Sequence, residues 1–511
     1  MRELFNTGGG HGAASSLEKL QNLVEEIRHQ RPGISDKVNL HNFGYLFDDL
    51  SRDAASRLPE CPETIAALKT LGSGMADPQP QTGPDSDIPS GYTYLGQFID
   101  HDITRDAQAG KLNELITEDD FDPIFADEAR HLIKNVRTAT LELDSVYAGG
   151  PEEDPDLYES DRVRFKLGRN RVDQAGLPEH IQSETNRRDI LRQADGRPVL
   201  GDQRNDENLL IAQTHHAFKQ FHNQIAEQLK GSASQRFYSA QKKVIQHYQW
   251  IVLHDFLPRI VSRTAHKNAL YDARFYADDK LTFMPFEFSV AAFRFGHSMV
   301  RQRYRHNSIF AKDVADFALM FDFTNGGSRP MPLPNRAIID WSNFYQFEGP
   351  PANFARPIDT RLSTELERLP NETGLMRMLA IRNLLRGYLM SLPTGQAVAE
   401  RIGVKPLSNA ELLTNTSRNE RNALRCSALS ARTPLWYYIL KESAVREQGK
   451  RLGDIGSTIV AETLVALIKR SKHSILQEAS WKPDLADETG RFTMSELLTI
   501  CEFEEAMPAF A

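Results

Sequence analysis

The sequence predicts a mostly α-helical protein with long connecting loops and few short strands. Apolar residues recur at helical spacing in several long stretches, and strand-like alternation is sparse and local. No repeat with a period of about 20–50 residues occurs. The 511 residues, with 40% hydrophobic and 25% charged content, are sufficient for a sizeable core. A chain of this length is ordinarily divided into roughly two to four domains.

The first 90 residues read as an extension that leads into the main part of the chain. A Gly-rich start precedes an amphipathic helix predicted over Ser16 to His29. Residues 72–92 contain many Gly, Pro, Asp and Ser residues, which is typical of a long loop.

The stretch YLGQFIDHDITRD, residues 94–106, is the most informative part of the chain. On a helix, Gln97, Asp100 and His101 fall at i, i+3 and i+4 and share one face, while Asp102 points elsewhere. A carboxylate next to an imidazole on a half-buried helix is costly unless the pair has a function. The alternative is a surface helix with an isolated histidine, and the stretch alone does not decide between them.

The remaining pattern is a series of helices separated by polar loops. Residues 112–162 are acidic and are interpreted as solvated surface. Helices are predicted in the second half of 200–230, over about 239–261, after residue 285, and over 378–390 and 458–470.

Composition excludes several classes of protein. Three distant cysteines, Cys61, Cys426 and Cys501, argue against a disulfide framework or a Cys-x-x-Cys site. The net charge of −8 argues against a nucleic-acid partner. We expect no membrane span, because no run of about 18 apolar residues occurs. With no secretory signal visible, cytoplasmic residence is the default, and signal-independent export stays open.

Several polar groups interrupt otherwise apolar helical stripes. A lone histidine on such a face is most often a satisfied core residue, and His215 and His222 are assigned to that class. His297 differs, because Arg294 lies one turn before it on an otherwise apolar stripe. An imidazole in an apolar groove, held by an acceptor on its other nitrogen, is suited to bind haem iron.

Cleavage of a peroxide O–O bond needs a neutral base and a nearby cation. His101 is suited to act as the base. Arg204, in the turn before a helix, is suited to supply the cation because a guanidinium stays protonated and presents several donors.

Five motifs occur in the order found in the animal-type haem peroxidase superfamily, the peroxidase–cyclooxygenase superfamily. They are GQFIDHD (96–102), GDQRNDE (201–207), HHAFKQFHN (215–223), FRFGHSMV (293–300) and RNLLRG (382–387). LPTGQAVA (392–399) and LGDIGSTIVAETLVALI (452–468) resemble its bacterial branch. The resemblance implies helices around one buried haem b in a single large domain, residues 91–511, with residues 1–90 as an extension packing on it.

The resemblance also implies roles for individual residues. His101 matches the distal histidine, Gln97 the pocket glutamine and Arg204 the distal catalytic arginine. His297 matches the proximal ligand of the haem iron, and Asn383 its hydrogen-bond partner.

Other matches concern the edge of the haem. Arg294 and Arg386 stand where family members meet the haem propionates. Asp100 and Glu207 match two acids that form ester bonds to the haem in mammalian members. A third link in one of those members needs a methionine where this chain has Asn208, so that link is excluded.

The family's calcium site maps onto this chain as well. Asp102 matches the ligand that follows the distal histidine, and Thr138 matches a loop ligand. Thr140 would contribute its backbone, Glu142 replaces an Asp and Asp144 replaces a Ser. These hard oxygen ligands are suited to Ca²⁺.

The resemblance implies a hydrogen-peroxide-dependent peroxidase that works through an oxoferryl intermediate, with a role in the response to oxidative stress. Its donors would be small anions (iodide, bromide, thiocyanate), aromatic compounds or both. One alternative is a fatty-acid dioxygenase or cyclooxygenase, which carries a tyrosine where this chain has Arg294. The other is a haem-free scaffold, against which His101, Arg204 and His297 argue. The donor and the oligomeric state are not indicated.

Overall fold

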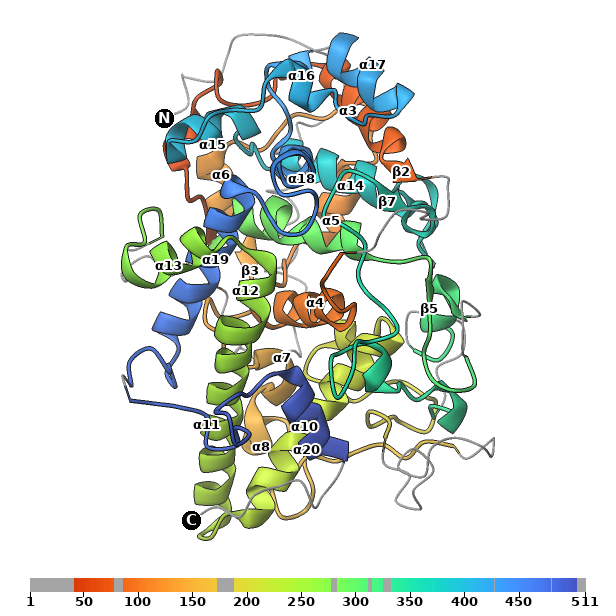
Figure 1. Ribbon diagram of the computed structural model, residues 1–511, viewed down its shortest axis with the longest axis vertical. Helices are drawn as coiled ribbons and strands as arrows, with labels where there is room; N and C mark the ends of the chain where they lie inside the picture. Colours follow the sequence, from red (N-terminus) through yellow and green to blue (C-terminus); the bar gives the residue numbers. More distant parts are fainter. Residues whose placement is uncertain are drawn as a thin grey trace, which may run out of the picture.

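The structure, a computed structural model, describes residues 41–77, 86–171, 188–276, 283–310, 315–324, 332–370, 372–426, 428–478 and 480–502. Within these ranges it is mostly helical, with a few very short strands (Figure 1). The predicted fold class is therefore confirmed. The helix predicted over Ser16 to His29 lies outside the described residues.

Seven longer α-helices form most of the described part of the chain: α3 (Pro62–Gly74), α4 (Gly91–Ile103), α10 (Leu209–Gln228), α11 (Ala233–Ile251), α14 (Leu379–Leu389), α18 (Leu435–Arg446) and α19 (Asp454–Arg470). The shorter α-helices are α2 (Asp48–Arg52), α5 (Ala109–Leu115), α6 (Ala126–Leu132), α7 (Asp144–Tyr147), α8 (Gly150–Glu153), α12 (Leu257–Ile260), α13 (Arg263–Tyr271), α15 (Gly395–Ile402), α16 (Asn409–Leu412), α17 (Arg418–Cys426) and α20 (Met494–Glu502).

Tighter and wider helical turns complete the helical set. Two of those among the described residues are π-helices, η3 (Val252–Phe256) and η4 (Glu287–Ala291). The 3₁₀ segments are η1 (Pro155–Leu157), η2 (Gln203–Asp206), η5 (Ala292–Met299), η6 (Phe317–Met320), η7 (Asn335–Ala337), η8 (Trp341–Asn343), η9 (Thr364–Glu367), η10 (Gly374–Arg377) and η11 (Ala428–Ser430).

The strands in the described ranges form three small sheets. They are β1 (His41–Gly44), β2 (Ala76–Asp77), β3 (Lys134–Asn135), β4 (Phe283–Pro285), β5 (Arg303–Tyr304), β6 (Ala315–Asp316) and β7 (Leu362–Ser363). The largest has the order β3-β1-β4, in which β1 runs parallel to β4 and antiparallel to β3. β2 pairs with β7 in parallel, and β5 pairs with β6 antiparallel.

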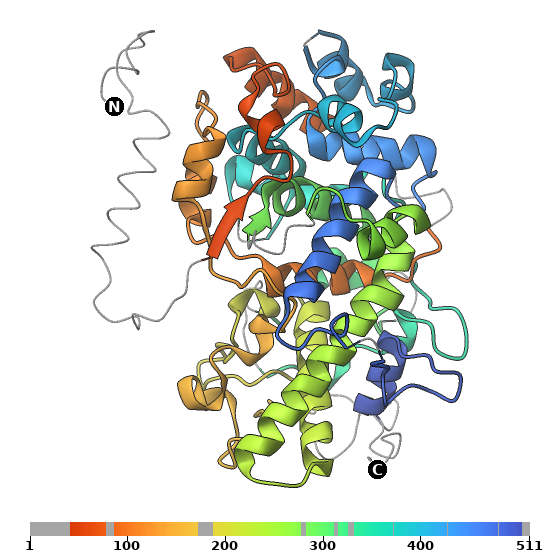
Figure 2. The same ribbon diagram turned by 90° about the vertical axis from the view of Figure 1, so that its left-hand side faces the viewer.

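Helix α4 lies in the middle of the molecule in both ribbon views (Figures 1 and 2). Its apolar side chains Leu95, Phe98 and Ile99 are fully buried. The ring of Phe98 stacks on Phe218 of α10 with 4.9 Å between centroids. Burying apolar side chains of this size stabilises each by roughly 1.5–3 kcal/mol, so α4 is fixed on the side away from its polar residues.

The helix predicted after Pro285 forms, but it is not an α-helix. The chain makes the π-helix η4 and then tightens into the 3₁₀ helix η5, with a break at Ala291 (φ −127°, ψ −72°). The apolar stripe around His297 nevertheless lines one cavity. Such irregular turns are frequent at functional sites and change the direction in which side chains point.

The long helix predicted over about 239–261 begins earlier and changes form within its length. Ser232 and Gln235 make a capping box that starts α11 at Ala233. The π-helix η3 and the short α12 then continue it to Ile260.

The described part of the N-terminal segment is hydrogen-bonded to η4, the π-helix that precedes His297. The carboxylate of Glu287 in η4 accepts hydrogen bonds from the backbone amides of Leu46 and Phe47, both at 3.0 Å. Gly44 lies so close to Phe283 that a Cβ there would be 2.6 Å from the ring. One hydrophobic cluster contains buried residues from Phe43 to Cys501. The domain boundary at residue 90 stays a prediction.

The acidic region 112–162 combines exposed charge with buried apolar side chains. Asp120 and Asp122 are exposed, while Phe121, Leu157 and Tyr158 are buried.

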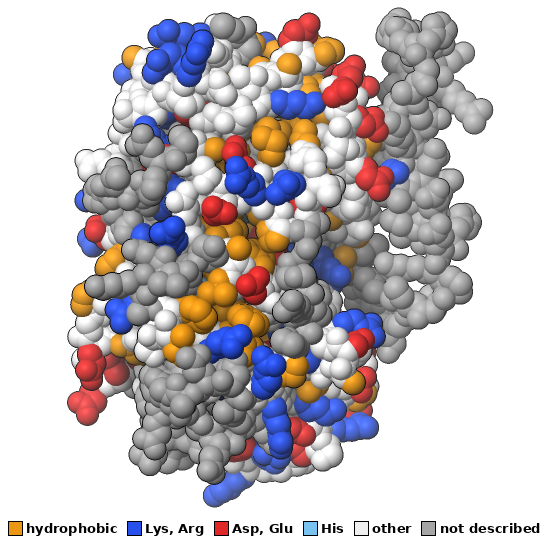
Figure 3. Space-filling model, turned by 90° about the vertical axis from the view of Figure 1, so that its right-hand side faces the viewer, with side chains coloured by type: hydrophobic (Ala, Val, Ile, Leu, Met, Phe, Trp, Pro, Cys, Tyr) orange, Lys and Arg blue, Asp and Glu red, His pale blue; other side chains and the backbone are white. Residues whose placement is uncertain are grey.

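On the face of the molecule drawn in Figure 3, hydrophobic side chains gather in the middle, with charged side chains of both signs around them. No helix in the described part of the chain is long and apolar enough to cross a membrane.

Candidate functional site

The structure brings all nine residues predicted at the haem to one cavity of about 410 Å³. Its lining includes Gln97, Asp100, His101, Arg204, Glu207, Arg294, His297, Asn383 and Arg386. Aromatic and aliphatic side chains such as Val290, Phe293, Phe317, Phe321 and Leu366 complete the wall. An apolar cavity with a few convergent polar groups is the usual form of a cofactor site.

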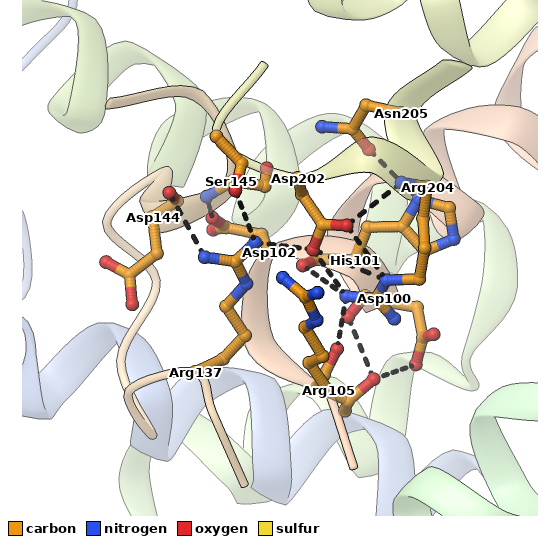
Figure 4. Close-up of polar contacts among 12 residues, drawn as sticks. Asp100, His101, Asp102, Arg105, Arg137, Asp144, Ser145, Asp202, Arg204 and Asn205 are labelled. Carbon is orange, nitrogen blue, oxygen red and sulfur yellow. Dashed lines mark hydrogen bonds and ion pairs between the residues drawn. The ribbon is translucent and has the colours of Figure 1, made fainter. Parts of the chain in front are cut away.

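The polar residues of α4 lie on two different sides of the helix, as the sequence predicts. His101 is buried beside the cavity, where Gln97 donates to Glu207 (Nε2 to Oε2, 3.1 Å). Nε2 of His101 lies 3.9 Å from the same Glu207 oxygen. Asp102 points the opposite way, toward Ser145 (Figure 4).

His101 is held as a neutral base. Burial, and next the charge of Arg204, lower the pKa of His101 to about 3. Its Nδ1 lies 2.9 Å from Oδ1 of Asn205, so Nε2 is the nitrogen that faces Glu207. A neutral imidazole of this kind can accept a proton from a molecule in the cavity.

This lowered pKa predicts a peroxide reaction that is insensitive to mild acid. An ordinary histidine, with a pKa of about 6.5, would be mostly protonated at pH 5 and would lose its function as a base. His101 should stay neutral there, so the second-order rate constant with peroxide at pH 5 should equal that at pH 7. Stopped-flow measurements on haem-loaded protein test this. A rate that falls about tenfold per pH unit below 6.5 would contradict it.

Arg204 is fixed by an aspartate two residues earlier. Asp202 caps η2 by accepting from the backbone amide of Arg204 (3.0 Å), and its carboxylate also pairs with the guanidinium. Nη2 of Arg204 donates to the carbonyls of His101 (3.0 Å) and Thr104 (2.6 Å). Asp202 also pairs with Arg137 (Figure 4).

Two cations hold Asp202 ionised. Burial opposes ionisation of Asp202, but the charges of Arg204 and Arg137 outweigh it and lower the pKa of the carboxyl well below its usual value. The guanidinium of Arg204 is therefore anchored to α4 and to a fixed anion while it lines the cavity.

On the proximal side, His297 contacts Asn383 as predicted. Nδ2 of Asn383 lies 2.8 Å from Nδ1 of His297, and Oδ1 of Asn383 accepts from Nη1 of Arg294 at 2.6 Å. Burial, and next Arg294, lower the pKa of His297 to about 3, so the ring is neutral as a metal ligand must be. A metal bound at Nε2 puts the hydrogen on Nδ1, and Asn383 must then turn its oxygen toward the ring.

Besides Arg204, three more guanidinium groups line the cavity, those of Arg294, Arg382 and Arg386. Burial and the charges of Arg386 and Arg382 lower the pKa of Arg294 to about 9, and burial also lowers the pKa values of Arg382 and Arg386. Arg386 pairs with Asp106 at 3.2 Å, yet its buried Nε has no hydrogen-bond partner among the described residues. This mutual repulsion favours an anionic group in the cavity.

The donor set fits a haem. A neutral imidazole faces the cavity with its other nitrogen held, and clustered guanidinium groups are suited to two propionates. Asp100 and Glu207 also line the cavity, and burial is the main cause that raises both of their pKa values. Ester links through these two acids stay a prediction.

The predicted calcium ligands are gathered only in part. Asp102 is fully buried and accepts from the backbone amides of Leu143 (3.0 Å) and Ser145 (3.2 Å). Burial, and next the carboxylate of Asp144, raise the pKa of Asp102. Leu143 has φ 58°, a left-handed conformation that costs roughly 1–3 kcal/mol in a non-glycine residue.

The other predicted calcium ligands divide into two groups. The hydroxyl of Thr138 lies 2.7 Å from that of Thr140 and donates to Asp144 at 2.6 Å. The carboxylate of Glu142 instead accepts from the backbone amides of Lys472 and His473. Among the described residues no group of three or more His, Cys, Asp or Glu side chains is arranged to hold a metal ion. Calcium stays a prediction.

Some functional residues were missed by the sequence reasoning. Asp202, Asn205, Asp106 and Arg382 all contact predicted site residues or line the cavity. Asp202 and Asn205 lie within the GDQRNDE motif, and Arg382 begins RNLLRG, so position within a motif was the available signal. Asp106 lies outside the five motifs, but it ends the stretch 94–106 that the sequence analysis singled out.

Two histidines predicted as core residues are both buried and hydrogen-bonded. His222 is bonded to Tyr147 (3.0 Å) and to the carbonyl of Val163 (2.9 Å), which is the expected structural role. His215 is bonded to Asn205 at 2.9 Å, and so it is connected to His101.

Comparisons with known proteins agree with this geometry. The model of the animal haem peroxidase family matches residues 127–429, a range that contains Arg204, His297 and Asn383. No curated protein sequence matches this chain.

Three solved structures share the fold. Peroxidase A from Dictyostelium discoideum has 16% identity and a TM-score of 0.55, with 85% of this chain and 88% of that chain covered. Fatty acid α-dioxygenase from Arabidopsis thaliana has 12% identity and a TM-score of 0.51, with 96% and 84% covered. A point variant of the Oryza sativa fatty acid α-dioxygenase, solved with palmitic acid, has 11% identity and a TM-score of 0.51, with 96% and 92% covered.

The family model covers more than half of the chain, and the solved structures cover most of it with the same fold. This chain belongs to the animal haem peroxidase family.

Proposed function

We propose that this protein is a haem peroxidase that reduces hydrogen peroxide and oxidises a small donor. His101 acts as the acid and base toward peroxide, and Arg204 stabilises the charge that develops as the O–O bond breaks. His297 binds the iron, and Gln97 helps to orient peroxide. The donors we propose are iodide, bromide, thiocyanate or aromatic compounds.

One observation carries this proposal: His101, Arg204 and His297 line the same cavity. Bound haem supplies the two-electron redox chemistry. The chain supplies a neutral Nε2 at His101 that takes a proton from one peroxide oxygen and returns it to the other. Arg204 is locked by Asp202, so its charge needs no rearrangement during the reaction.

The test is the absorption spectrum of haem-loaded protein mixed with hydrogen peroxide. A Soret band that shifts with peroxide, and returns when iodide, thiocyanate or an aromatic donor is added, is expected. If the spectrum of haem-loaded protein does not change when peroxide is added, the proposal is wrong. Oxygen uptake with a fatty acid and no added peroxide would favour the oxygenase alternative instead, and a protein that takes up no haem would favour a scaffold.

We also propose ester links between the haem and the carboxylates of Asp100 and Glu207, because both line the cavity. Such links should form during turnover with peroxide, so haem should become resistant to extraction by acidified organic solvent after peroxide treatment. Asp100→Asn combined with Glu207→Gln should release all haem under the same conditions. If wild-type protein also releases all of its haem after treatment, the links do not form.

We propose that Ca²⁺ binds between Asp102 and the loop that carries Thr138, Thr140 and Asp144. A cation there would relieve the repulsion between two carboxylates and fix the strained loop. Chelation should therefore lower the melting temperature, and Ca²⁺ at about 100 times its Kd should add roughly 2.7 kcal/mol of stability. Asp102→Asn should abolish this response.

The control for calcium is Asp122→Asn, which changes an exposed carboxylate outside the loop and should keep the response. A melting temperature of wild-type protein that is the same with chelator and with Ca²⁺ would reject the site.

A further inference from the structure

We propose that Asn205 is a positioning residue that fixes which ring nitrogen of His101 carries hydrogen, and that it couples this hydrogen position to that of His215. Asn205 lies in η2 directly after Arg204 and is fully buried. Its Oδ1 is 2.9 Å from Nδ1 of His101, and its Nδ2 is 2.9 Å from Nδ1 of His215. One side-chain amide therefore bridges two buried imidazoles.

The chemistry of the amide makes this bridge directional. An amide has an oxygen that only accepts and a nitrogen that only donates. With Oδ1 of Asn205 facing His101, the hydrogen of His101 must be on Nδ1 and the lone pair on Nε2. With Nδ2 facing His215, Nδ1 of His215 must be the acceptor, so its hydrogen is on Nε2.

The reversed amide would select the other form of His101. Nδ2 of Asn205 would then face Nδ1 of His101, which would have to accept, and the hydrogen would move to Nε2. Such a ring presents N–H to the cavity and cannot take a proton there. In the reversed orientation Nδ1 of His215 would face the amide oxygen, so His215 would have to move its hydrogen from Nε2 to Nδ1. The orientation of this one amide therefore sets the hydrogen positions of both histidines together.

The surrounding elements hold the bridge in place. His215 is 1% exposed on α10, and α10 starts at a fixed point because Asn208 accepts from the backbone amide of Ile211 at 3.1 Å. Asn208 also donates to Gln97 at 3.2 Å, which connects the start of α10 to α4. The two imidazoles and the amide therefore belong to elements that are joined independently of the bridge.

This inference rests on the proposed function only for its consequence, the rate with peroxide. The position of the hydrogen can be measured on haem-free protein. Protein labelled with ¹⁵N-histidine reports the protonated ring nitrogen through its chemical shift. The variants His101→Leu and His215→Leu identify the two sets of signals.

The decisive variants are Asn205→Asp and Asn205→Leu. A carboxylate at position 205 has only acceptors, so His101 should keep its hydrogen on Nδ1 while His215 moves its hydrogen from Nε2 to Nδ1. Asn205→Leu, which is similar in size, should leave His101 in a mixture of both forms. In haem-loaded protein, Asn205→Leu should slow the reaction with peroxide about 10- to 100-fold, and Asn205→Asp should keep most of the rate. A purely structural role for Asn205 predicts no inversion at His215.

Three results would overturn the inference: wild-type His101 with its hydrogen on Nε2, an Asn205→Leu spectrum for His101 identical to wild type, or an unchanged His215 in Asn205→Asp. If Asn205→Leu does not fold, the spectra of wild-type protein and of Asn205→Asp still test whether Asn205 sets the hydrogen positions of the two histidines. If haem-loaded wild-type protein does not react with peroxide, the proposed function is wrong. The spectra of the haem-free protein would still test the bridge on their own.

Discussion

Replacing His297 with alanine is expected to abolish stable haem binding, the largest effect of any single change in this protein. The imidazole is neutral, lines the cavity and contacts Asn383 through Nδ1, so Nε2 is the ring nitrogen left for iron once the oxygen of Asn383 faces the ring. Alanine removes that ligand and opens space of about the size of the ring. Haem content per protein, measured from the Soret band and the iron content after purification, should fall close to zero.

Two controls separate loss of a ligand from loss of the fold. His131→Ala, which removes an exposed histidine on α6, should keep full haem content. Imidazole added to His297→Ala should restore part of the Soret band by filling the vacated space. Full haem loading of His297→Ala without imidazole would exclude His297 as the iron ligand.

Replacing His101 with leucine is expected to leave haem binding intact and to slow the reaction with peroxide. His101 lines the cavity and is the acid–base group that we propose. A positioned acid–base group contributes typically about 10²–10⁴-fold to a rate. Leucine has a similar volume and cannot accept a proton. Stopped-flow spectroscopy at several peroxide concentrations should therefore show a second-order rate constant lower by about that factor, with an unchanged amount of haem.

The contrast between the two variants is informative in itself. His297→Ala should lose the cofactor, while His101→Leu should keep the cofactor and lose the rate. His131→Ala again serves as the reference. A wild-type peroxide rate in His101→Leu would remove His101 from the mechanism.

The fold class and much of the site were predictable because they depend on local sequence. The i, i+3, i+4 spacing of Gln97, Asp100 and His101 places them together on any helix, and α4 forms as predicted. Asp102 is off that face for the same geometric reason, and it contacts the loop at Leu143 and Ser145 rather than the cavity. The nine residues predicted at the haem likewise line one cavity, and their individual roles stay predictions.

What could not be predicted depends on contacts between distant segments. The π-helix and 3₁₀ helix that carry His297 have the apolar stripe of an α-helix, and only packing distinguishes these forms. The capping role of Asp202 and the bridge through Asn205 need the three-dimensional approach of η2 to α4. Glu142, predicted to face calcium, contacts the loop after α19, which is about 330 residues away in the chain.

The hydrogen bonds of Glu287 have a consequence for the order in which the protein matures. They join Glu287 to Leu46 and Phe47, which are 241 and 240 residues earlier in the chain. Contacts of such high separation form late and slow folding, because a long loop must close before they contribute. At a synthesis rate of about 5–20 residues per second, the strand at His41–Gly44 is made many seconds before its partner strand at Phe283–Pro285. The side of the cavity that carries His297 is therefore completed late, and we expect the newly made chain to acquire its haem only after most of the protein has left the ribosome.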